Sequence, residues 1–69
     1  MEEVHLNPTD RAALDMLRDG RCTPSYIAAE HDYSRQNVQN RLTRLEELGF
    51  VHRVHKGLYE LIEDPRGDT

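Results

Sequence analysis

Apolar residues along the first half of the chain repeat with the period of an α-helix. Ala13, Leu14 and Leu17 recur at helical spacing, and they predict a first helix over Pro8–Asp19. A shorter apolar pattern predicts a second helix over Pro24–Glu30. Each expected helix, including the third described next, follows a residue whose side chain can cap backbone N–H groups, namely Asn7, Thr23 and Ser34.

The third apolar pattern is the clearest. It predicts a helix over Arg35–Leu48 with one narrow apolar stripe. The stripe is formed by residues spaced four, three and three apart, which are Val38, Leu42, Leu45 and Leu48. The opposite side of this helix should therefore be polar along its whole length.

After the third helix the apolar pattern changes to the alternation of β-strands. Two strands are predicted, over Phe50–His55 and Leu58–Ile62, joined by the two-residue turn Lys56-Gly57. A regular hairpin around this turn fixes which side chains lie opposite one another. The expected cross-strand pairs are Val54 with Tyr59, His52 with Leu61 and, as a charge pair, Arg53 with Glu60.

The order of elements predicts an α+β fold, a winged helix-turn-helix in which three helices are followed by a β-hairpin wing. Residues 1–69 are expected to form a single domain, with a core over about residues 6–62 and a frayed tail over 63–69. Asp32 tolerates the left-handed conformation and therefore suits the tight turn between the second and third helices. A core this small is marginal, so a partner subunit would stabilise it.

The charge of the chain is unevenly distributed. The net charge is −4, yet residues Ser34–Gly57 hold five basic and two acidic residues, a balance of +3, and the remainder balances to −7. A locally basic segment can attract phosphate even on an acidic body. Eight of the nine basic residues are arginine, which together with the acidic excess resembles the bias of extreme halophiles; chance in a short chain is the alternative. In a salt-rich cytoplasm, base contacts would have to carry more of any affinity for DNA.

Other residue patterns exclude several classes of protein. No apolar run approaches the roughly 20 residues of a membrane span, and no signal-peptide pattern is present, so a cytoplasmic protein is expected. Cys22 is the single cysteine, which leaves no intrachain disulfide; we expect a small buried residue, with a redox sensor as the alternative. The histidines follow no metal-binding motif, and in a regular strand His52 and His55 would lie on opposite faces. No catalytic motif or phosphate-binding loop occurs, so no enzyme, metal, cofactor or small-molecule effector is expected.

The polar face of the third helix carries the strongest functional signal. Amides can pair with adenine in the major groove and arginine with guanine, and a recognition helix places its N-terminal residues against base edges. The residues expected to contact double-stranded DNA from this helix are Ser34, Arg35, Gln36, Asn37, Gln39, Asn40, Thr43 and Arg44. The wing residues expected on the DNA backbone or in the minor groove are Arg53, His55 and Lys56. The alternatives are a polar face that only keeps the domain soluble and a hairpin turn that is only solvated.

Several short stretches together resemble the winged-helix core of prokaryotic transcription regulators. They are Ile27-Ala28-Ala29, Asp32-Tyr33-Ser34, Val38, Leu42, Leu45, Gly49-Phe50-Val51 and Gly57-Leu58-Tyr59-Glu60-Leu61. In length and acidity the chain is similar to the small phage-repressor-like winged-helix proteins of haloarchaea. The resemblance covers about Leu6 to Ile62, and it departs from the common pattern where Asp32 replaces the usual glycine.

The resemblance implies a DNA-binding transcriptional regulator, a repressor that acts as a homodimer. It implies a recognition helix over Ser34–Arg44 and a wing over Arg53–Lys56. The competing hypothesis is a protein-interaction module, because winged helices also serve as docking domains and an acidic body suits that role. A basic third-helix face with exposed amides would favour DNA, and an acidic or apolar face would favour a protein partner.

Overall fold

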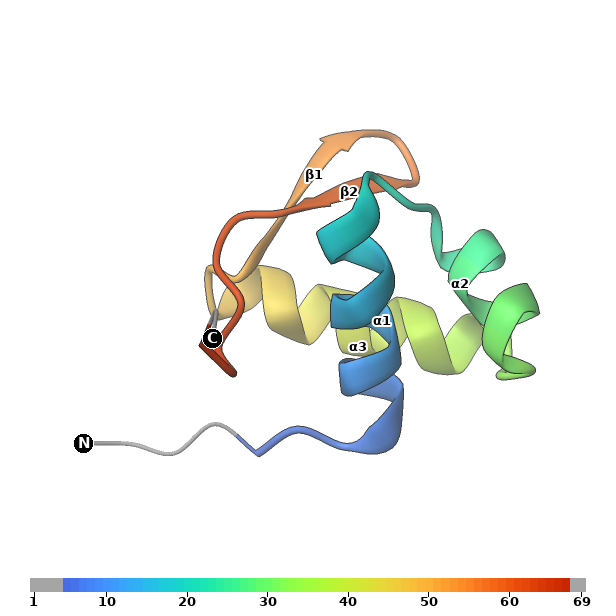
Figure 1. The fold of residues 1–69 in the computed structure, drawn as a ribbon. Helices are drawn as coiled ribbons and strands as arrows, with labels where there is room; N and C mark the ends of the chain where they lie inside the picture. Colours follow the sequence, from blue (N-terminus) through green and yellow to red (C-terminus); the bar gives the residue numbers. More distant parts are fainter. Residues whose placement is uncertain (1–4, 68–69) are drawn as a thin grey trace.

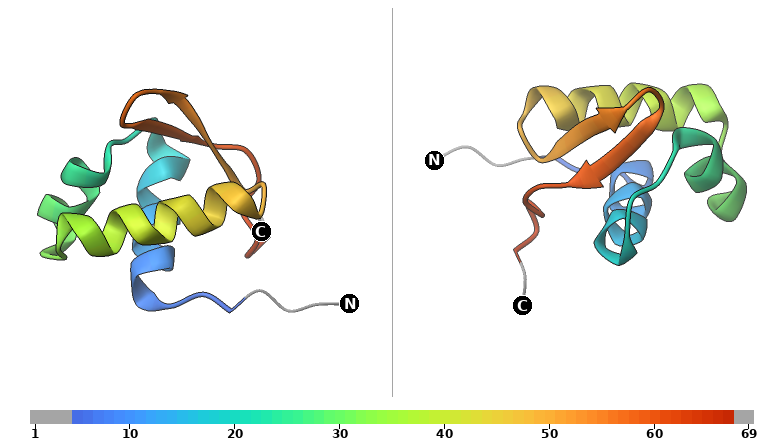
Figure 2. Two further views of the ribbon diagram at one scale, coloured as in Figure 1. Left: turned by 180° about the vertical axis from the view of Figure 1, so that it is seen from behind. Right: turned by 90° about the horizontal axis from the view of Figure 1, so that it is seen from above.

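Three helices are followed by a two-stranded antiparallel hairpin in the computed structural model, which describes residues 5–67 (Figure 1). The elements are α1 (Pro8–Asp19), α2 (Pro24–His31), α3 (Arg35–Glu47), β1 (Val51–His55) and β2 (Leu58–Leu61). Helix α1 crosses α3, and α2 packs near the start of α3 (Figure 2). The hairpin packs against both α1 and α3. The predicted α+β winged helix is therefore confirmed; α1 has the predicted bounds, and each other element differs by one residue at one end.

Each helix begins at the predicted residue, after a side chain that caps its first backbone N–H groups. The Asn7 side chain accepts a hydrogen bond from the Asp10 backbone N–H (2.8 Å), and the Asp10 carboxylate accepts one from the Asn7 N–H (2.9 Å). Thr23 and Ser34 cap α2 and α3 in the simpler way. Asp32 ends α2 with φ of 59°, the left-handed conformation expected of it. The turn between α2 and α3 thus forms without glycine.

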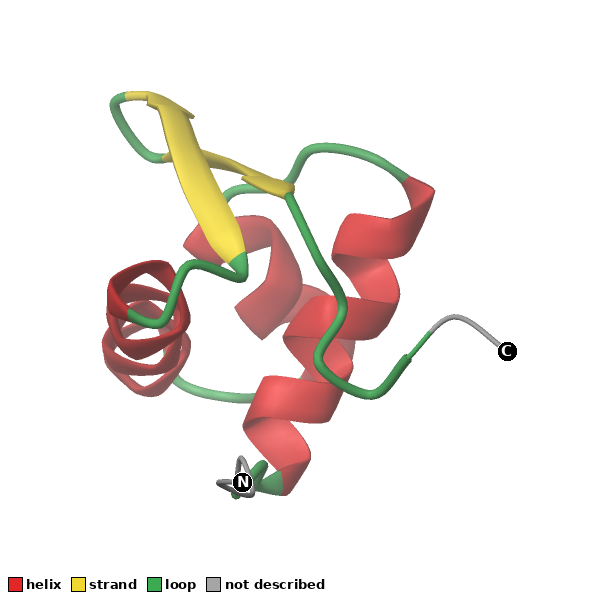
Figure 3. Cartoon of the chain, turned by 90° about the vertical axis from the view of Figure 1, so that its left-hand side faces the viewer, coloured by secondary structure: helices red, strands yellow, loops and turns green. Residues whose placement is uncertain are grey.

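The core lies where the three helices and the hairpin meet, and Figure 3 shows this arrangement in a view along α3. The predicted stripe of α3 is fully buried at Val38, Leu42 and Leu45. Leu48 differs, because α3 ends at Glu47 and the Leu48 side chain leaves the stripe and is 41% exposed. Each large apolar side chain that is fully buried contributes about 1.5–3 kcal/mol, so the shared stripe fixes α3 against its neighbours.

The hairpin register differs from the regular one. His55 lies opposite Leu58, as the Lys56-Gly57 turn requires, but Val54 is an extra residue that forms a β-bulge. The pairs beyond the bulge are Arg53 with Tyr59, His52 with Glu60 and Val51 with Leu61, so the three predicted pairs are wrong. The reason is burial. A regular register would turn His52 toward the core, whereas the one-residue shift buries Val51, which is 1% exposed, beside Tyr59.

The link between α1 and α2 adds a short third segment to the hairpin. Cys22 and Tyr59 exchange backbone hydrogen bonds of 3.0 and 2.9 Å on the open side of β2. The same link gives Glu60 its ionic partner, Arg21 at 3.2 Å, so the predicted Arg53–Glu60 pair is wrong. Cys22 is buried, and burial together with nearby Asp19 raises the pKa of its thiol. A thiol with a raised pKa is a poor nucleophile, which agrees with a small residue at the edge of the core.

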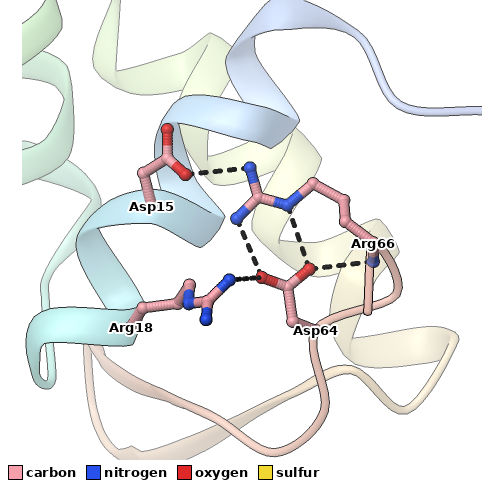
Figure 4. A network of polar contacts seen from close by, with 4 residues as sticks. All are labelled: Asp15, Arg18, Asp64 and Arg66. Atoms are coloured by element: carbon pink, nitrogen blue, oxygen red, sulfur yellow. Dashed lines mark hydrogen bonds and ion pairs between the residues drawn. The ribbon is translucent and has the colours of Figure 1, made fainter. Parts of the chain in front are cut away.

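The segment after β2 is held against α1 by a network of ion pairs (Figure 4). The Asp64 carboxylate, whose side chain is 5% exposed, accepts hydrogen bonds from the Arg66 backbone and guanidinium and lies 3.3 Å from Arg18. Arg66 also reaches Asp15 on α1 at 2.8 Å. Within the tail predicted as frayed over 63–69, Asp64 and Arg66 thus have partners on α1, more than 40 residues away in the chain, while residues 68 and 69 lie outside the described range.

Acid is expected to weaken this network. Hydrogen bonds from the Arg66 side chain hold the pKa of Asp64 below its ordinary value of 3.8. A carboxyl with a lowered pKa stabilises the fold above its unfolded pKa, and the contribution is lost as the pH falls through the folded pKa. Arg66→Ala should therefore lower the free energy of unfolding by about 1–2 kcal/mol at pH 7 and by less at pH 2, as measured by urea unfolding. The control is Arg53→Ala on the exposed wing, and an equal loss for Arg66→Ala at both pH values would contradict the expectation.

Candidate nucleic-acid interface

Helix α3 presents one long face that the rest of the described chain leaves uncovered. Seen from behind, α3 lies across the front of the molecule, and none of the elements within residues 5–67 crosses it (Figure 2, left). The inner side of α3 is the buried apolar stripe, so the outer side follows from the helical period. We call the exposed side chains Gln36, Asn40, Thr43 and Arg44 the α3 outer face.

Two of the residues predicted to read DNA also attach α3 to the body of the domain. Asn37 is half-buried, and its Nδ2 donates a 2.9 Å hydrogen bond to Oγ1 of buried Thr9 on α1. Gln39 is half-buried as well, and its Nε2 donates a 3.0 Å hydrogen bond to Oη of Tyr59 on β2. These amides lie on opposite flanks of α3 and fix its rotation relative to α1 and the hairpin.

The remaining amides lie on the outer face and bond to each other. Gln36 Nε2 donates to Asn40 Oδ1 at 2.9 Å, one helical turn apart, and both side chains are exposed. Gln39 Nε2 also donates to Thr43 Oγ1 at 3.3 Å, which links the flank to the outer face. The outer face is therefore a short, partly ordered row of hydrogen-bonding groups.

The first residues of α3 belong to the turn with α2. Ser34 caps the helix by accepting a 3.0 Å hydrogen bond from the Asn37 backbone N–H. Arg35 Nε donates to Ser25 Oγ at 3.1 Å, which directs the exposed guanidinium along the N-terminal end of α2. The Nη groups of Arg35 keep donors that can reach an anion.

The three wing residues predicted to contact DNA lie close together at the tip of the hairpin. Arg53, His55 and Lys56 line one shallow hollow beside the turn of the hairpin, and all three are exposed. The bulge at Val54 has a second effect here. Because His52 pairs with Glu60 and His55 with Leu58, the register places both histidines on one face of the sheet, so the expectation of opposite faces is wrong.

Sequence reasoning missed the ion pair that connects α3 to the start of α1. Arg41 Nε and Nη2 donate to the two carboxylate oxygens of Asp10 at 2.6 and 2.9 Å. The Asp10 side chain is fully buried, and these hydrogen bonds raise the pKa of Arg41. The only signal in the sequence is the position of Arg41 on the flank of the apolar stripe, next to Leu42. Nothing in the pattern pairs it with a helix cap 31 residues earlier.

This ion pair changes the charge available for a ligand. Arg41, counted in the basic segment, is neutralised by Asp10, and Arg44 is weakly paired with Glu47 at 3.7 Å. Arg35, Arg53 and Lys56 form no ion pair with other residues of the described range 5–67. The cationic groups therefore lie at the two ends of the candidate interface, at the start of α3 and at the wing tip.

Other candidate sites are limited. Over residues 5–67, no three His, Cys, Asp or Glu side chains lie close enough to hold a metal ion. In the same range no helix combines the length and hydrophobicity that crossing a bilayer demands. Of the two tyrosines near α2, Tyr33 packs against the core and Tyr26 is 53% exposed beside Cys22.

Comparison with known proteins supports the winged helix. A family model described as "MarR family" matches residues 6–57. A solved structure described as "PigF with SAH" is similar with a TM-score of 0.65 and 32% sequence identity, over 78% of this chain. The chain spans only 17% of that protein's length, so the likeness concerns one small part of it. No curated protein matches the chain.

Proposed function

Because the chain belongs to the MarR family, we propose that it is a transcriptional regulator that binds double-stranded DNA at specific sequences. MarR-family proteins are DNA-binding regulators rather than enzymes. In the proposed complex α3 enters the major groove, and the wing follows the backbone or the minor groove. The chain acts as a repressor by occupying its site.

The observation that carries the proposal is the α3 outer face. It combines two exposed amides, a hydroxyl and an arginine, the side chains that read base edges in the major groove. Apolar groups are absent from this row, although a docking surface for a protein would need them at its centre. The late residues Glu46 and Glu47 lie at the far end of α3, where they can remain outside the groove.

The exposed cations support a phosphate-binding role at both ends of α3. Arg35 stands at the helix start, and Arg53 and Lys56 stand at the wing tip. Such contacts fix the position of a protein on DNA but carry no sequence information. This division favours a binding mode in which the cations hold the duplex through its phosphates, while the α3 outer face distinguishes one base sequence from another.

We further propose that the active form is a homodimer that binds two half-sites. Leu48 and Ile62 are 41% and 60% exposed, so a partner subunit would bury apolar surface that one copy leaves in water. The acidic body and the preference for arginine suit a salt-rich cytoplasm, where repulsion between acidic groups is screened.

A binding competition tests the proposed function. Labelled duplexes from the region upstream of the gene are titrated with the protein in high salt, with random duplex as competitor. Specific binding predicts a preference of at least about 1,000-fold for one fragment over random duplex, at the low end of what DNA regulators achieve. Equal affinity for every fragment would contradict specific regulation. The absence of binding to any duplex would favour the protein-interaction module.

A further inference from the structure

The four amides near the start of α3 divide into two functional pairs. Asn37 donates one N–H to Thr9 and Gln39 donates one to Tyr59, so both hold the helix in place. Gln39 donates its second N–H to Thr43, so it has no N–H left for a base. Gln36 and Asn40 remain, and their one recorded side-chain contact within residues 5–67 is with each other.

The hydrogen bond between them fixes which way the Asn40 amide faces. A carboxamide has a donor end and an acceptor end of nearly equal size, and an exposed one can rotate between the two orientations. Gln36 Nε2 donates to Asn40 Oδ1 at 2.9 Å, so Oδ1 points toward Gln36 and Nδ2 keeps both of its N–H groups. The hydrogen bond therefore favours this orientation of the Asn40 amide before any ligand arrives.

A preset amide suits one base better than the others. Adenine offers an N6 donor and an N7 acceptor side by side at its major-groove edge, and an amide can satisfy both at once. A carbonyl oxygen has two lone pairs, so Asn40 Oδ1 can accept from Gln36 and from adenine N6 while Nδ2 donates to N7. Orienting the amide beforehand reduces the entropy cost of ordering this side chain when DNA binds.

We propose that Gln36 and Asn40 read DNA as one unit, in which Asn40 pairs with an adenine and Gln36 is the residue that positions Asn40. The proposal rests on the proposed DNA-binding function and makes it more specific. It assigns Gln36 no base of its own, although both side chains are exposed. The two side chains therefore control the same base position.

Selection of bound sequences from a random duplex pool tests the unit. The proteins compared are wild type, Asn40→Ala, Gln36→Met and the double variant. Wild type should select a motif with one adenine favoured by about 5–150-fold over other bases. Asn40→Ala should abolish that preference, and Gln36→Met, which keeps the side-chain length without a donor, should reduce it at least threefold. In the Asn40→Ala background, Gln36→Met should have no further effect at that position.

The other base positions of the motif serve as the internal control, since a change in the fold would alter all of them. Thermal unfolding of both single variants should match wild type because the two side chains are exposed. Gln36→Ala, a favourable helix substitution, is the second variant should Gln36→Met fold poorly. Effects of Gln36→Met and Asn40→Ala at different positions, or independent effects at one position, would overturn the reading unit and leave specific DNA binding intact. Failure of wild type to select any motif would instead overturn the proposed function.

Discussion

Replacing Arg41 by methionine is expected to lower the free energy of unfolding by about 3 kcal/mol. The variant leaves the fully buried Asp10 carboxylate without the two guanidinium donors that now bind it. Breaking a buried ion pair costs roughly 3–5 kcal/mol, and the 29% exposure of Arg41 places this pair at the low end. In a domain of this size the melting temperature should fall by about 12–24 °C, which circular dichroism can follow.

Two further variants separate this effect from the loss of any arginine on α3. Arg44→Met removes an exposed arginine, 58% accessible and 3.7 Å from Glu47, and should change stability by less than about 0.5 kcal/mol. Asp10→Asn combined with Arg41→Met leaves no buried charge and should recover part of the loss. An Arg41→Met protein as stable as Arg44→Met would show that the ion pair does not hold α3 to α1.

The affinity of the protein for DNA is expected to fall steeply with salt. If Arg35, Arg53 and Lys56 each neutralise one phosphate, the logarithm of the affinity should change with a slope of about −2.7 per protomer. A tenfold rise in salt would then weaken binding roughly 500-fold per protomer. Removing two contacts, in Arg53→Ala/Lys56→Ala, should reduce the slope to about −0.9 and weaken binding to all sequences alike. Fluorescence anisotropy titrations at several salt concentrations give the slopes.

Asn40→Ala provides the matched comparison for the wing variant. It removes a base contact and no charge, so it should weaken binding to the selected motif and keep the wild-type slope. A slope that is unchanged in Arg53→Ala/Lys56→Ala would place the wing away from the DNA backbone. The two variants together therefore separate the residues that hold the duplex from those that read it.

Local signals were sufficient to predict the helices and the fold. The Asn7 cap, the proline that follows it and Gly20 bound α1 at the residues the sequence indicates, Pro8 and Asp19. Such signals act over three or four residues, and each requires no knowledge of the rest of the chain. The winged-helix order then follows because each apolar face needs another element to cover it.

The hairpin register could not be predicted because burial elsewhere in the fold determines it. The turn sequence alone favours a regular hairpin, while the bulge at Val54 depends on burying Val51 and Tyr59 against the helices. The contact between Cys22 and β2 adds a further constraint that no pattern within the hairpin encodes. Predictions of strand location were therefore right to within a residue or so, and predictions of pairing were wrong.

The sequence predicts which side of α3 forms the candidate site, but it does not predict the role of each residue on that side. Helical periodicity identifies the polar side of α3, and the exposure of Gln36, Asn40 and Arg44 agrees with it. Periodicity does not show that Asn37 and Gln39, at the edges of that side, have partners 28 and 20 residues away. Their attachment roles require the tertiary fold, and the part of each outer-face residue in DNA binding stays a prediction.

The attachment of α3 has a consequence for how such a protein can diversify. Within residues 5–67, every side-chain hydrogen bond between α3 and α1 or β2 comes from the flanks of the helix, at Asn37, Gln39 and Arg41, and the apolar contacts come from its buried stripe. After gene duplication, a copy that changed only the α3 outer face would keep its fold and its helix orientation. New target sites are then reachable by a few tolerated substitutions, and the same positions are the natural ones to randomise in a library for retargeting the domain.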